Sequence, residues 1–397
     1  MVLKAFKLRL YPNKTQRNQI HVNFGCARFV WNQMLNMHIE RYKNNKKAKF
    51  QGRYSMDVML KALKIEYPWL KQAESTSLQR VNRDLDDAFQ RFFNHSLQNG
   101  FPRFKSKKNT NQSYTSKFVN NNIRIVDEHH IKLPKLGLVY FKAGRILNGK
   151  IRAVTVRVNS RKQYQASILV ESENQTFKKT KKSVGIDLGL KSLTITSDGQ
   201  KEDILKVDDR LNKKLRIWER KKSRRYENAK KAMAFDEHDK VLFPRTDLKQ
   251  FPRYQQAVRT VAKLKKHIAE RRRDNLHKLT TRLVKDYDTI VVENLSVKNM
   301  MQNHHLSASI ANASWGTLIS QLKYKCAWYG KRLIIIDPKN TSRICHECKQ
   351  KNHEFDSLSQ SEWLAAREWD CPNCHAHLDR DVNAAKNILA KGLETLS

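Results

Sequence analysis

The chain has 397 residues, enough for two or three domains of about 150 residues each. Its 78 Lys and Arg against 38 Asp and Glu give a formal net charge of +40, well beyond the roughly 2–8 of a small domain, and this surplus favours a polyanion as partner. No apolar run approaches the roughly 20 residues of a membrane helix, and the first residues lack the apolar stretch of a secretory signal, so we expect a cytoplasmic protein that binds nucleic acid rather than a membrane.

The first part of the chain predicts one strand followed by helices. Residues 3–11 alternate apolar and basic side chains, as a strand does. Residues 15–100 contain few glycines and carry apolar residues at helical spacing. For the last helix of this stretch, Ser75 or Ser77 is the expected N-cap.

Residues 101–180 are rich in short β-type runs. These runs are residues 123–126, 138–141, 153–158 and 165–170. The last two are expected to form a hairpin around a turn at 159–162. We therefore expect a compact β domain, such as a small barrel, that takes in the N-terminal strand and leaves the helical segment as an insertion.

The second half predicts strands separated by basic helices. Residues 184–190 and 192–196 predict a hairpin, and residues 205–285 are strongly basic and mostly helical in pattern. The remaining expected elements are a strand at 289–293, a helix at 314–330, a strand at 332–336 and a final helix from about Asp381.

Four of the six cysteines form two C-x-x-C pairs, Cys345 with Cys348 and Cys371 with Cys374. In a reducing cytosol this spacing predicts a zinc ribbon rather than disulfides. Four thiolates complete the tetrahedral shell of Zn²⁺, so the zinc is expected to be structural, and the nearby histidines are expected to lie outside the shell. The two remaining cysteines, Cys26 and Cys326, stand alone, and Cys326 is expected to pack in the core because it lies on an apolar stripe at helical spacing.

Three acidic residues stand in or beside apolar segments: Asp187, Glu293 and Asp381. Gly185 and Gly189 flank Asp187 at the period of a strand and are expected to leave its face open. A carboxylate in an apolar setting is costly unless it is solvated, paired or bound to metal. Each acid alone also fits a strand end or a helix cap, but together they predict a site for Mg²⁺ or Mn²⁺ that hydrolyses phosphodiesters.

Asp379 competes with Asp381 for the third position. At about 100° per helical residue, Asp381 falls on the side of the final helix that carries Ala385 and Ile388. Asp379 falls on the opposite side if the helix extends that far. We therefore expect Asp381 to face the sheet.

Several segments resemble the transposon-encoded TnpB/OrfB family, whose relatives are the compact type V CRISPR effectors. The acids lie in VGIDLGLKSLTIT, IVVENLSVKNM and LDRDVNAAKNI, and the cysteine pairs come just before the last of these. The segments AFKLRLYPNKTQ, GCARFVWNQML, STSLQRVNRDLDDAFQRFF, FPRFKSKK and NTSRICHEC also resemble the family, so the resemblance covers most of the chain.

This resemblance implies a multidomain α/β fold. An RNase H-like RuvC nuclease domain with an inserted zinc ribbon would follow a wedge-type β-barrel that carries a helical recognition insertion. The implied boundaries are 1–12 and 101–180 for the barrel, 13–100 for the insertion, 181–340 and 379–397 for the nuclease, and 341–378 for the ribbon.

The resemblance also implies RNA-guided DNA cleavage next to a short motif in the target duplex. The metal-binding acids would be Asp187, Glu293 and Asp381, and the cofactors would be structural Zn²⁺, catalytic Mg²⁺ or Mn²⁺, and a guide RNA from the transposon end. Double-stranded target DNA would be the substrate, with one protein per RNA, action at the nucleoid, and a separate transposase encoded by the same element as a further partner.

Expected nucleic-acid contacts come from the basic and family-like segments. They are Gln79, Arg80, Arg103, Lys105, Arg271, Arg272 and Arg273. Because base pairing would carry the sequence recognition, many Lys and Arg that grip backbones suit this role.

Three other functions remain open at this point. A nuclease-inactive RNA-guided repressor would be expected to lack at least one of the acids, and a strand-transfer transposase would use the same two-metal chemistry. A zinc-ribbon RNA-binding structural protein of ribosomal type fits the basic charge, but not the length of 397 residues or the acids.

Overall fold

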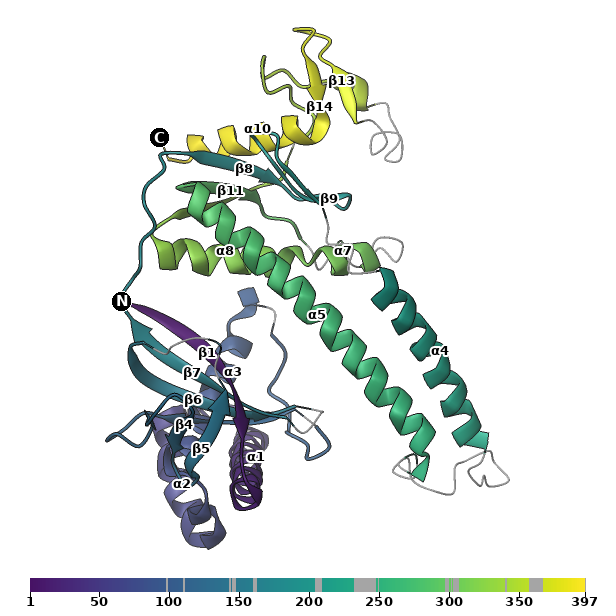
Figure 1. The fold of residues 1–397 in the computed structure, drawn as a ribbon. Coiled ribbons are helices and arrows are strands. Elements are labelled where there is room, and N and C mark those ends of the chain that lie inside the picture. The colour runs from purple at the N-terminus through teal and green to yellow at the C-terminus, as the bar shows by residue number, and fades with distance from the viewer. Residues whose placement is uncertain are drawn as a thin grey trace. The chain divides into compact units, whose positions relative to one another are not determined.

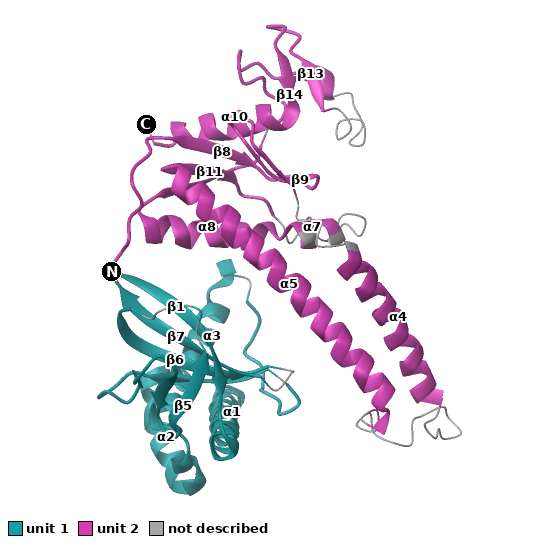
Figure 2. Ribbon diagram, viewed as in Figure 1, with its two compact units in different colours: residues 1–173 teal, residues 174–397 magenta. Residues whose placement is uncertain are grey.

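The computed structural model describes residues 1–97, 99–109, 111–142, 144, 148–159, 163–203, 209–231, 248, 250–296, 300, 302, 307–339, 341–356 and 367–396. The chain divides into two compact units, residues 1–173 and residues 174–397 (Figure 2). Among the described helices, none combines the length and the apolar character needed to cross a bilayer.

The first unit is built on a seven-stranded antiparallel sheet. Its strands are β1 (Val2–Tyr11), β2 (Gln112–Lys117), β3 (Arg124–Ile125), β4 (His130–Leu133), β5 (Gly137–Lys142), β6 (Lys150–Val158) and β7 (Tyr164–Ser172). They lie in the order β2-β6-β7-β1-β5-β4-β3, which confirms that the N-terminal strand joins the later ones. The β6–β7 hairpin is confirmed, although most of its turn lies outside the described residues. The described residues contain no pairing between β2 and β3, so closure into a barrel stays a prediction.

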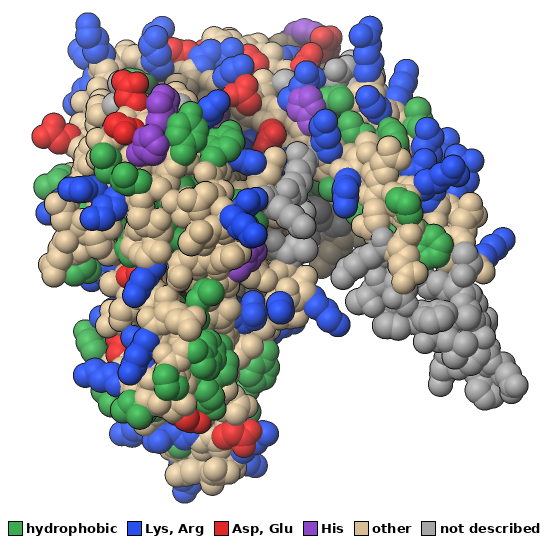
Figure 3. All heavy atoms as spheres, turned by 60° about the horizontal axis from the view of Figure 1, so that its bottom comes forward, with side chains coloured by type: hydrophobic (Ala, Val, Ile, Leu, Met, Phe, Trp, Pro, Cys, Tyr) green, Lys and Arg blue, Asp and Glu red, His purple; other side chains and the backbone are tan. Residues whose placement is uncertain are grey.

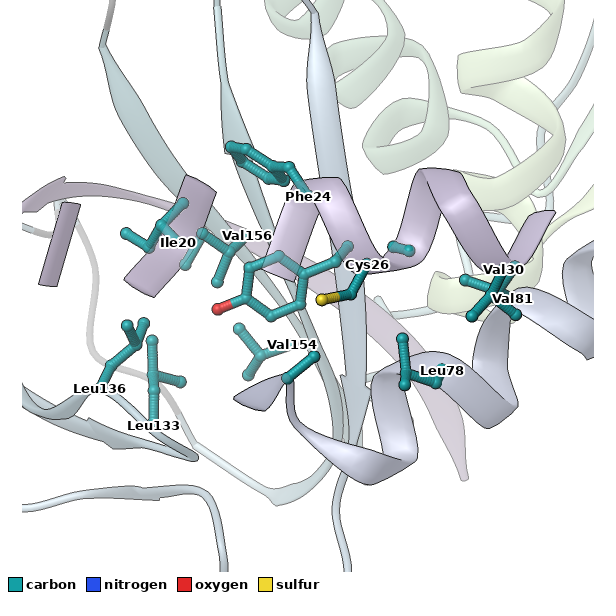
Figure 4. Close-up of a cluster of buried hydrophobic side chains, with 14 of the residues drawn as sticks. Ile20, Phe24, Cys26, Val30, Leu78, Val81, Leu133, Leu136, Val154 and Val156 are labelled. Carbon is teal, nitrogen blue, oxygen red and sulfur yellow. The ribbon is translucent and has the colours of Figure 1, made fainter. Parts of the chain in front are cut away.

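The helices of this unit lie between β1 and β2 in the chain. They are α1 (Lys14–Asn44), α2 (Arg53–Glu66), η1 (Pro68–Gln72), α3 (Ser75–Phe93) and η2 (His95–Leu97). Figure 4 shows Ile20 and Phe24 of α1 and Leu78 of α3 in one apolar cluster with Val154 and Val156 of β6. Cys26 is buried in this cluster.

The predicted cap of α3 is wrong. Glu74 is the N-cap, and its carboxylate accepts hydrogen bonds from the backbone N–H groups of Thr76 (2.9 Å) and Ser77 (2.6 Å). A carboxylate has two oxygens and a full negative charge, so it can satisfy two unpaired N–H groups and also interact with the helix dipole.

The second unit contains a five-stranded mixed sheet. Its strands are β8 (Ser183–Asp187), β9 (Ser192–Thr196), β10 (Lys201–Asp203), β11 (Thr289–Glu293) and β12 (Arg332–Ile336), in the order β10-β9-β8-β11-β12. Strands β8, β11 and β12 are parallel to one another. The described helices are α4 (Asp209–Lys231), α5 (Pro252–Asp286), α7 (Ser307–Ala313), α8 (Trp315–Tyr329) and α10 (Arg380–Glu394), with a short η4 (His353–Asp356). Figure 1 shows α10 on one face of the sheet, and α5 and α8 on the other.

Successive side chains of β8 and β11 point alternately to the two faces of the sheet. Val184 and Val292 belong to the core with α5 and α8, where Cys326 is buried as predicted. Gly185 lies on the α10 face, where an added Cβ would be 2.1 Å from the carbonyl oxygen of Ala385. The expectation that Gly185 leaves an open face is therefore wrong, because the backbone of α10 packs directly against this glycine.

The basic region predicted at 205–285 forms two long helices in its described part. Helices α4 and α5 lie side by side (Figure 1). Most of their Lys and Arg side chains are exposed. Figure 3 shows Lys and Arg spread widely over the face in view, with fewer Asp and Glu among them.

Candidate active site and metal centre

The sheet of the second unit brings two of the three predicted acids together. Asp187 ends β8 and Glu293 ends β11, and these strands are parallel neighbours in which Ile186 is paired with Val292. The next residues in this register, Asp187 and Glu293, therefore lie side by side at the carboxyl edge of the sheet. Both are on the face that α10 covers, because side chains alternate along a strand and Gly185 packs against α10.

Helix α10 supplies the third acid. The helix begins at Arg380, and Asp379 is its N-cap: Oδ1 of Asp379 accepts from the N–H groups of Asp381 (3.0 Å) and Val382 (2.9 Å). The other oxygen of Asp379 accepts from Nζ of Lys201 at 2.5 Å. Asp379 therefore stabilises the helix terminus, and Asp381 in the first turn is the acid whose charge acts on Asp187.

Burial disfavours the charged forms of Asp187 and Glu293. Burial, followed by the negative charges of Glu293 and Asp381, raises the pKa of Asp187 to about 7, while nearby Arg380 opposes this rise. Burial also raises the pKa of Glu293, against a hydrogen bond from Thr341. Carboxylates that repel one another in a poorly hydrated place are stabilised by a divalent cation, and an all-oxygen donor set fits Mg²⁺ or Mn²⁺.

The three acids are less tightly clustered than the cysteines. Among the described residues, only the four cysteines form a group of three or more ligand atoms that all lie within 4.8 Å of one another. Asp381 instead accepts hydrogen bonds from the guanidinium groups of Arg380 (3.0 Å) and Arg367 (3.3 Å). These two cations form ion pairs with Asp381 in the structure.

The four cysteines have the geometry of a tetrahedral zinc site. The Sγ atoms of Cys345 and Cys374 are 3.7 Å apart, and those of Cys348 and Cys371 are 3.6 Å apart. Four thiolates at about 2.3 Å from one Zn²⁺ would lie about 3.8 Å from each other. The donor set and its spacing therefore fit zinc.

The local backbone explains this spacing. In each C-x-x-C turn, the residue after the second cysteine donates its backbone N–H to the carbonyl oxygen of the first cysteine. Lys349 donates to Cys345 at 3.0 Å, and His375 donates to Cys371 at 2.8 Å. Lys349 and His375 both adopt positive φ, 61° and 56°. Two similar turns thus point two thiols each toward a shared centre, beside the hairpin β13 (Glu368–Asp370) and β14 (His377–Asp379).

Two of the described histidines near this site have other partners. His346 Nδ1 is 3.0 Å from Oδ1 of Asn383, and its Nε2 is 2.7 Å from Nζ of Lys386. His377 pairs with Asp370 at 2.8 Å. Both contacts agree with the expectation that histidines lie outside the thiolate shell.

The structure brings three of the predicted nucleic-acid contacts around one hollow of about 480 Å³ in the first unit. Arg80, Arg103 and Lys105 line it, whereas Gln79 is exposed on α3 outside it. Arg80 is already paired with Asp84 at 2.7 Å. The ammonium of Lys105 lies 3.5 Å from the centre of the Trp31 ring, and loss of hydration lowers its pKa to about 8.

The three arginines predicted on α5 differ in exposure. Arg271 and Arg273 are exposed. Arg272 is half-buried, its guanidinium donates to the carbonyl of Ala311 (3.3 Å), and burial lowers its pKa. Arg272 therefore connects α5 to α7, and the exposed side chains of Arg271 and Arg273 are better placed than Arg272 to contact phosphate groups.

Sequence reasoning missed the residues that surround the acids. Thr341 donates to Glu293, and Arg380 and Arg367 hold Asp381. A single threonine or arginine in a polar segment carries no signal of such a contact. The one available hint was the position of Thr341 just before the first cysteine pair, in a segment that resembles the family.

Three family models match separate parts of the chain. Residues 167–304 match a probable transposase, residues 1–47 a helix-turn-helix domain, and residues 315–388 the TNB domain of Cas12f1-like proteins. The last match spans α8, β12, the cysteine pairs and most of α10.

Similar proteins match nearly the whole chain. One from Streptomyces pristinaespiralis, named as a candidate RNA-guided DNA endonuclease, is 33% identical over 99% of this chain and 90% of its own length. InsQ of Escherichia coli strain K12, with the same designation, is 30% identical over 100% of this chain and 94% of its own. Among solved structures, a complex of Cas12f1 with guide RNA and target DNA is 13% identical, covering 98% of this chain and 99% of that one, with a TM-score of 0.35.

Proposed function

The chain belongs to the TnpB family, and on that premise we propose that it is a transposon-encoded, RNA-guided DNA endonuclease that hydrolyses target DNA with divalent metal ions. The observation that carries the proposal is the placement of Asp187 and Glu293 at adjacent strand ends, with Asp381 on the helix that covers them. The two relatives that span the chain carry the corresponding designation in their names.

Asp187, Glu293 and Asp381 are the residues that would hold Mg²⁺ or Mn²⁺. Such ions activate water and neutralise the leaving oxygen of a phosphodiester. Asp187 and Glu293 would present their carboxylates from the rigid sheet edge, and Asp381 from the first turn of α10. Arg380 and Arg367 would exchange Asp381 for phosphate oxygens when a nucleic acid enters, because guanidinium groups bind both anions well.

The architecture supports the domain assignment that we propose. The five-stranded sheet with α10 on one face would be the RuvC-type nuclease, and the cysteine site would be a structural zinc ribbon inserted between β12 and α10. In the first unit, the seven-stranded sheet would be the wedge domain, and α1, α2 and α3 would be its recognition insertion. A closed shell of four thiolates has no open position for substrate, which supports a structural role for zinc.

The net charge of +40 supports nucleic-acid partners. We propose a guide RNA that pairs with one DNA strand, one protein per RNA, and backbone contacts from exposed Lys and Arg such as Arg103, Arg271 and Arg273. Selection of the site would come from base pairing and a short duplex motif, while the many cations of the protein would hold the nucleic-acid backbones.

The test is cleavage by the purified ribonucleoprotein. The complex with guide RNA, given Mg²⁺ and a plasmid with a matching target, should linearise that plasmid, and Asp187→Ala should bind the target without cutting. Joined ends would indicate strand transfer, and binding without cutting by the unchanged protein would indicate a repressor. Either result would overturn the proposal.

A further inference from the structure

Thr341 contacts a predicted catalytic acid directly. It lies beyond β12, where the chain enters the zinc ribbon, and it is 6% exposed. Its hydroxyl donates to Oε1 of Glu293 at 2.6 Å. We propose that Thr341 is a positioning residue that fixes the Glu293 carboxylate for metal binding, an inference that rests on the proposed function.

The hydroxyl proton has one strong acceptor. The carbonyl oxygen of Pro338 is also within reach of Oγ1, but at 3.3 Å. A hydroxyl carries a single proton, and a charged acceptor at 2.6 Å is preferred over a neutral one at 3.3 Å. The proton is therefore directed to Glu293.

Two buried amides of α10 hold the segment that contains Thr341. Asn387 Nδ2 donates to the carbonyl oxygens of Thr341 (2.9 Å) and Ile344 (2.6 Å), and Asn383 Nδ2 donates to Ile344 (2.8 Å). Asn383 Oδ1 accepts the N–H of His346 at 2.8 Å. Asn383 is 1% exposed and Asn387 is 8% exposed, so these amides are buried with their partners. Helix α10 thus carries Asp381 and also fixes the partner of Glu293.

This arrangement limits the motion of the carboxylate. The terminal torsion of a glutamate has a broad energy minimum, so an unrestrained carboxylate samples many orientations. A hydrogen bond to Oε1 selects one of them and leaves Oε2 available to a cation. Hydrogen-bond partners of metal ligands typically change metal affinity or activity by roughly 10–100-fold when they are removed.

The experiment replaces the hydroxyl and keeps the shape. Thr341→Val removes the donor at nearly constant volume, and Thr341→Ser keeps it. Thr194→Val is the matched control: Thr194 is fully buried in β9 of the same unit, and its hydroxyl has no hydrogen-bond partner among the described residues. Its strand neighbour Ile195 is paired with Asp187, so Thr194 points to the opposite face of the sheet.

Mn²⁺ binding to the ribonucleoprotein is measured by electron paramagnetic resonance. The signal of the Glu293→Gln complex is subtracted from that of each variant, which removes the contribution of Mn²⁺ ions bound to the RNA. Thr341→Val should weaken this binding by roughly 10–100-fold and raise the Mg²⁺ needed for half-maximal cleavage by a similar factor. Thr341→Ser should restore both within a few-fold, and Thr194→Val should change neither. Target affinity should be the same for all variants.

Wild-type Mn²⁺ binding and cleavage by Thr341→Val would overturn the inference while leaving the proposed function intact. Unchanged cleavage by Glu293→Gln would overturn the proposed function itself. If Thr341→Val does not fold, Thr341→Ser and Thr341→Ala give the same comparison, because they differ only by the hydroxyl. Equal metal binding by that pair would also count against the inference.

Discussion

Replacing Gly185 by alanine perturbs the contact between β8 and α10 at a single point. An added Cβ would lie 2.1 Å from the carbonyl oxygen of Ala385 and 2.6 Å from the backbone nitrogen of Leu389. Backbone atoms of a helix cannot rotate away from a clash as a side chain can. To restore an ordinary contact of 3.4 Å, α10 must move by about 1.3 Å, the difference between 3.4 and 2.1 Å.

This movement has two expected effects. Overpacking a core typically costs about 1–3 kcal/mol, and each kcal/mol lowers the melting temperature by about 2–4 °C in a unit of this size. Because Asp381 lies on α10, it moves with the helix. A displacement of about 1 Å at a reacting centre can reduce the rate by about 100-fold. Gly185→Ala should therefore cut target DNA roughly 100-fold more slowly while guide and target remain bound.

The assay is single-turnover cleavage with saturating target, together with thermal melting of the same complex. Gly316→Ala is the control, because a Cβ at this position of α8 would meet no atom within 4 Å. Its melting temperature should stay the same or rise slightly, since alanine favours a helix over glycine by up to about 1 kcal/mol. Normal cleavage and normal melting of Gly185→Ala would refute the packing of α10 on β8.

Three further predictions concern zinc, pH and the choice between two acids. Cys345→Ser should lower the zinc content below one per chain and make residues 341–379 sensitive to protease, as measured by metal analysis and limited proteolysis. The carboxylate of Asp288 accepts a hydrogen bond from the buried ammonium of Lys331, and this bond holds the pKa of Asp288 below its ordinary value. The contribution of Asp288 to the free energy of unfolding is therefore full above about pH 4 and is lost as the pH falls further. Asp288→Asn should therefore cost about 3 kcal/mol at pH 7, with a smaller difference from wild type below about pH 4 in denaturant unfolding. Asp379→Ala should lose about 1 kcal/mol of cap stability and keep measurable cleavage, whereas Asp381→Ala should abolish cleavage in the same single-turnover assay.

Local patterns were sufficient to predict the elements that carry the acids. Apolar segments predicted β8 and β11, and an acid within the first segment and one at the end of the second singled out Asp187 and Glu293. The strand predicted over residues 184–190 ends earlier in the structure, at Asp187. Helical periodicity also predicted that Ala385 and Ile388 are buried, as they are. Each of these inferences depends on residues within one element, where spacing alone determines which side chains share a face.

Contacts between distant segments could not be predicted in this way. Thr341 and Glu293 are far apart in the chain, and they meet because β12 lies beside β11 and returns the chain to the same sheet edge. The error at Gly185 has the same origin. A glycine beside an acid in a strand suggests open space, but the space is filled by a helix from the far end of the chain.

Helix α10 contributes both to the candidate site and to the packing of the unit, because closely spaced residues at its start have different roles. Asp379 caps the helix, the charge of Asp381 acts on Asp187, and Asn383 and Asn387 hold the segment that leads into the ribbon. The small residue Ala385 lets the helix approach Gly185 at backbone distance. A change at any of these positions therefore affects stability and acid placement together, and only paired variants such as Thr341→Ser with Thr341→Val can separate the two effects.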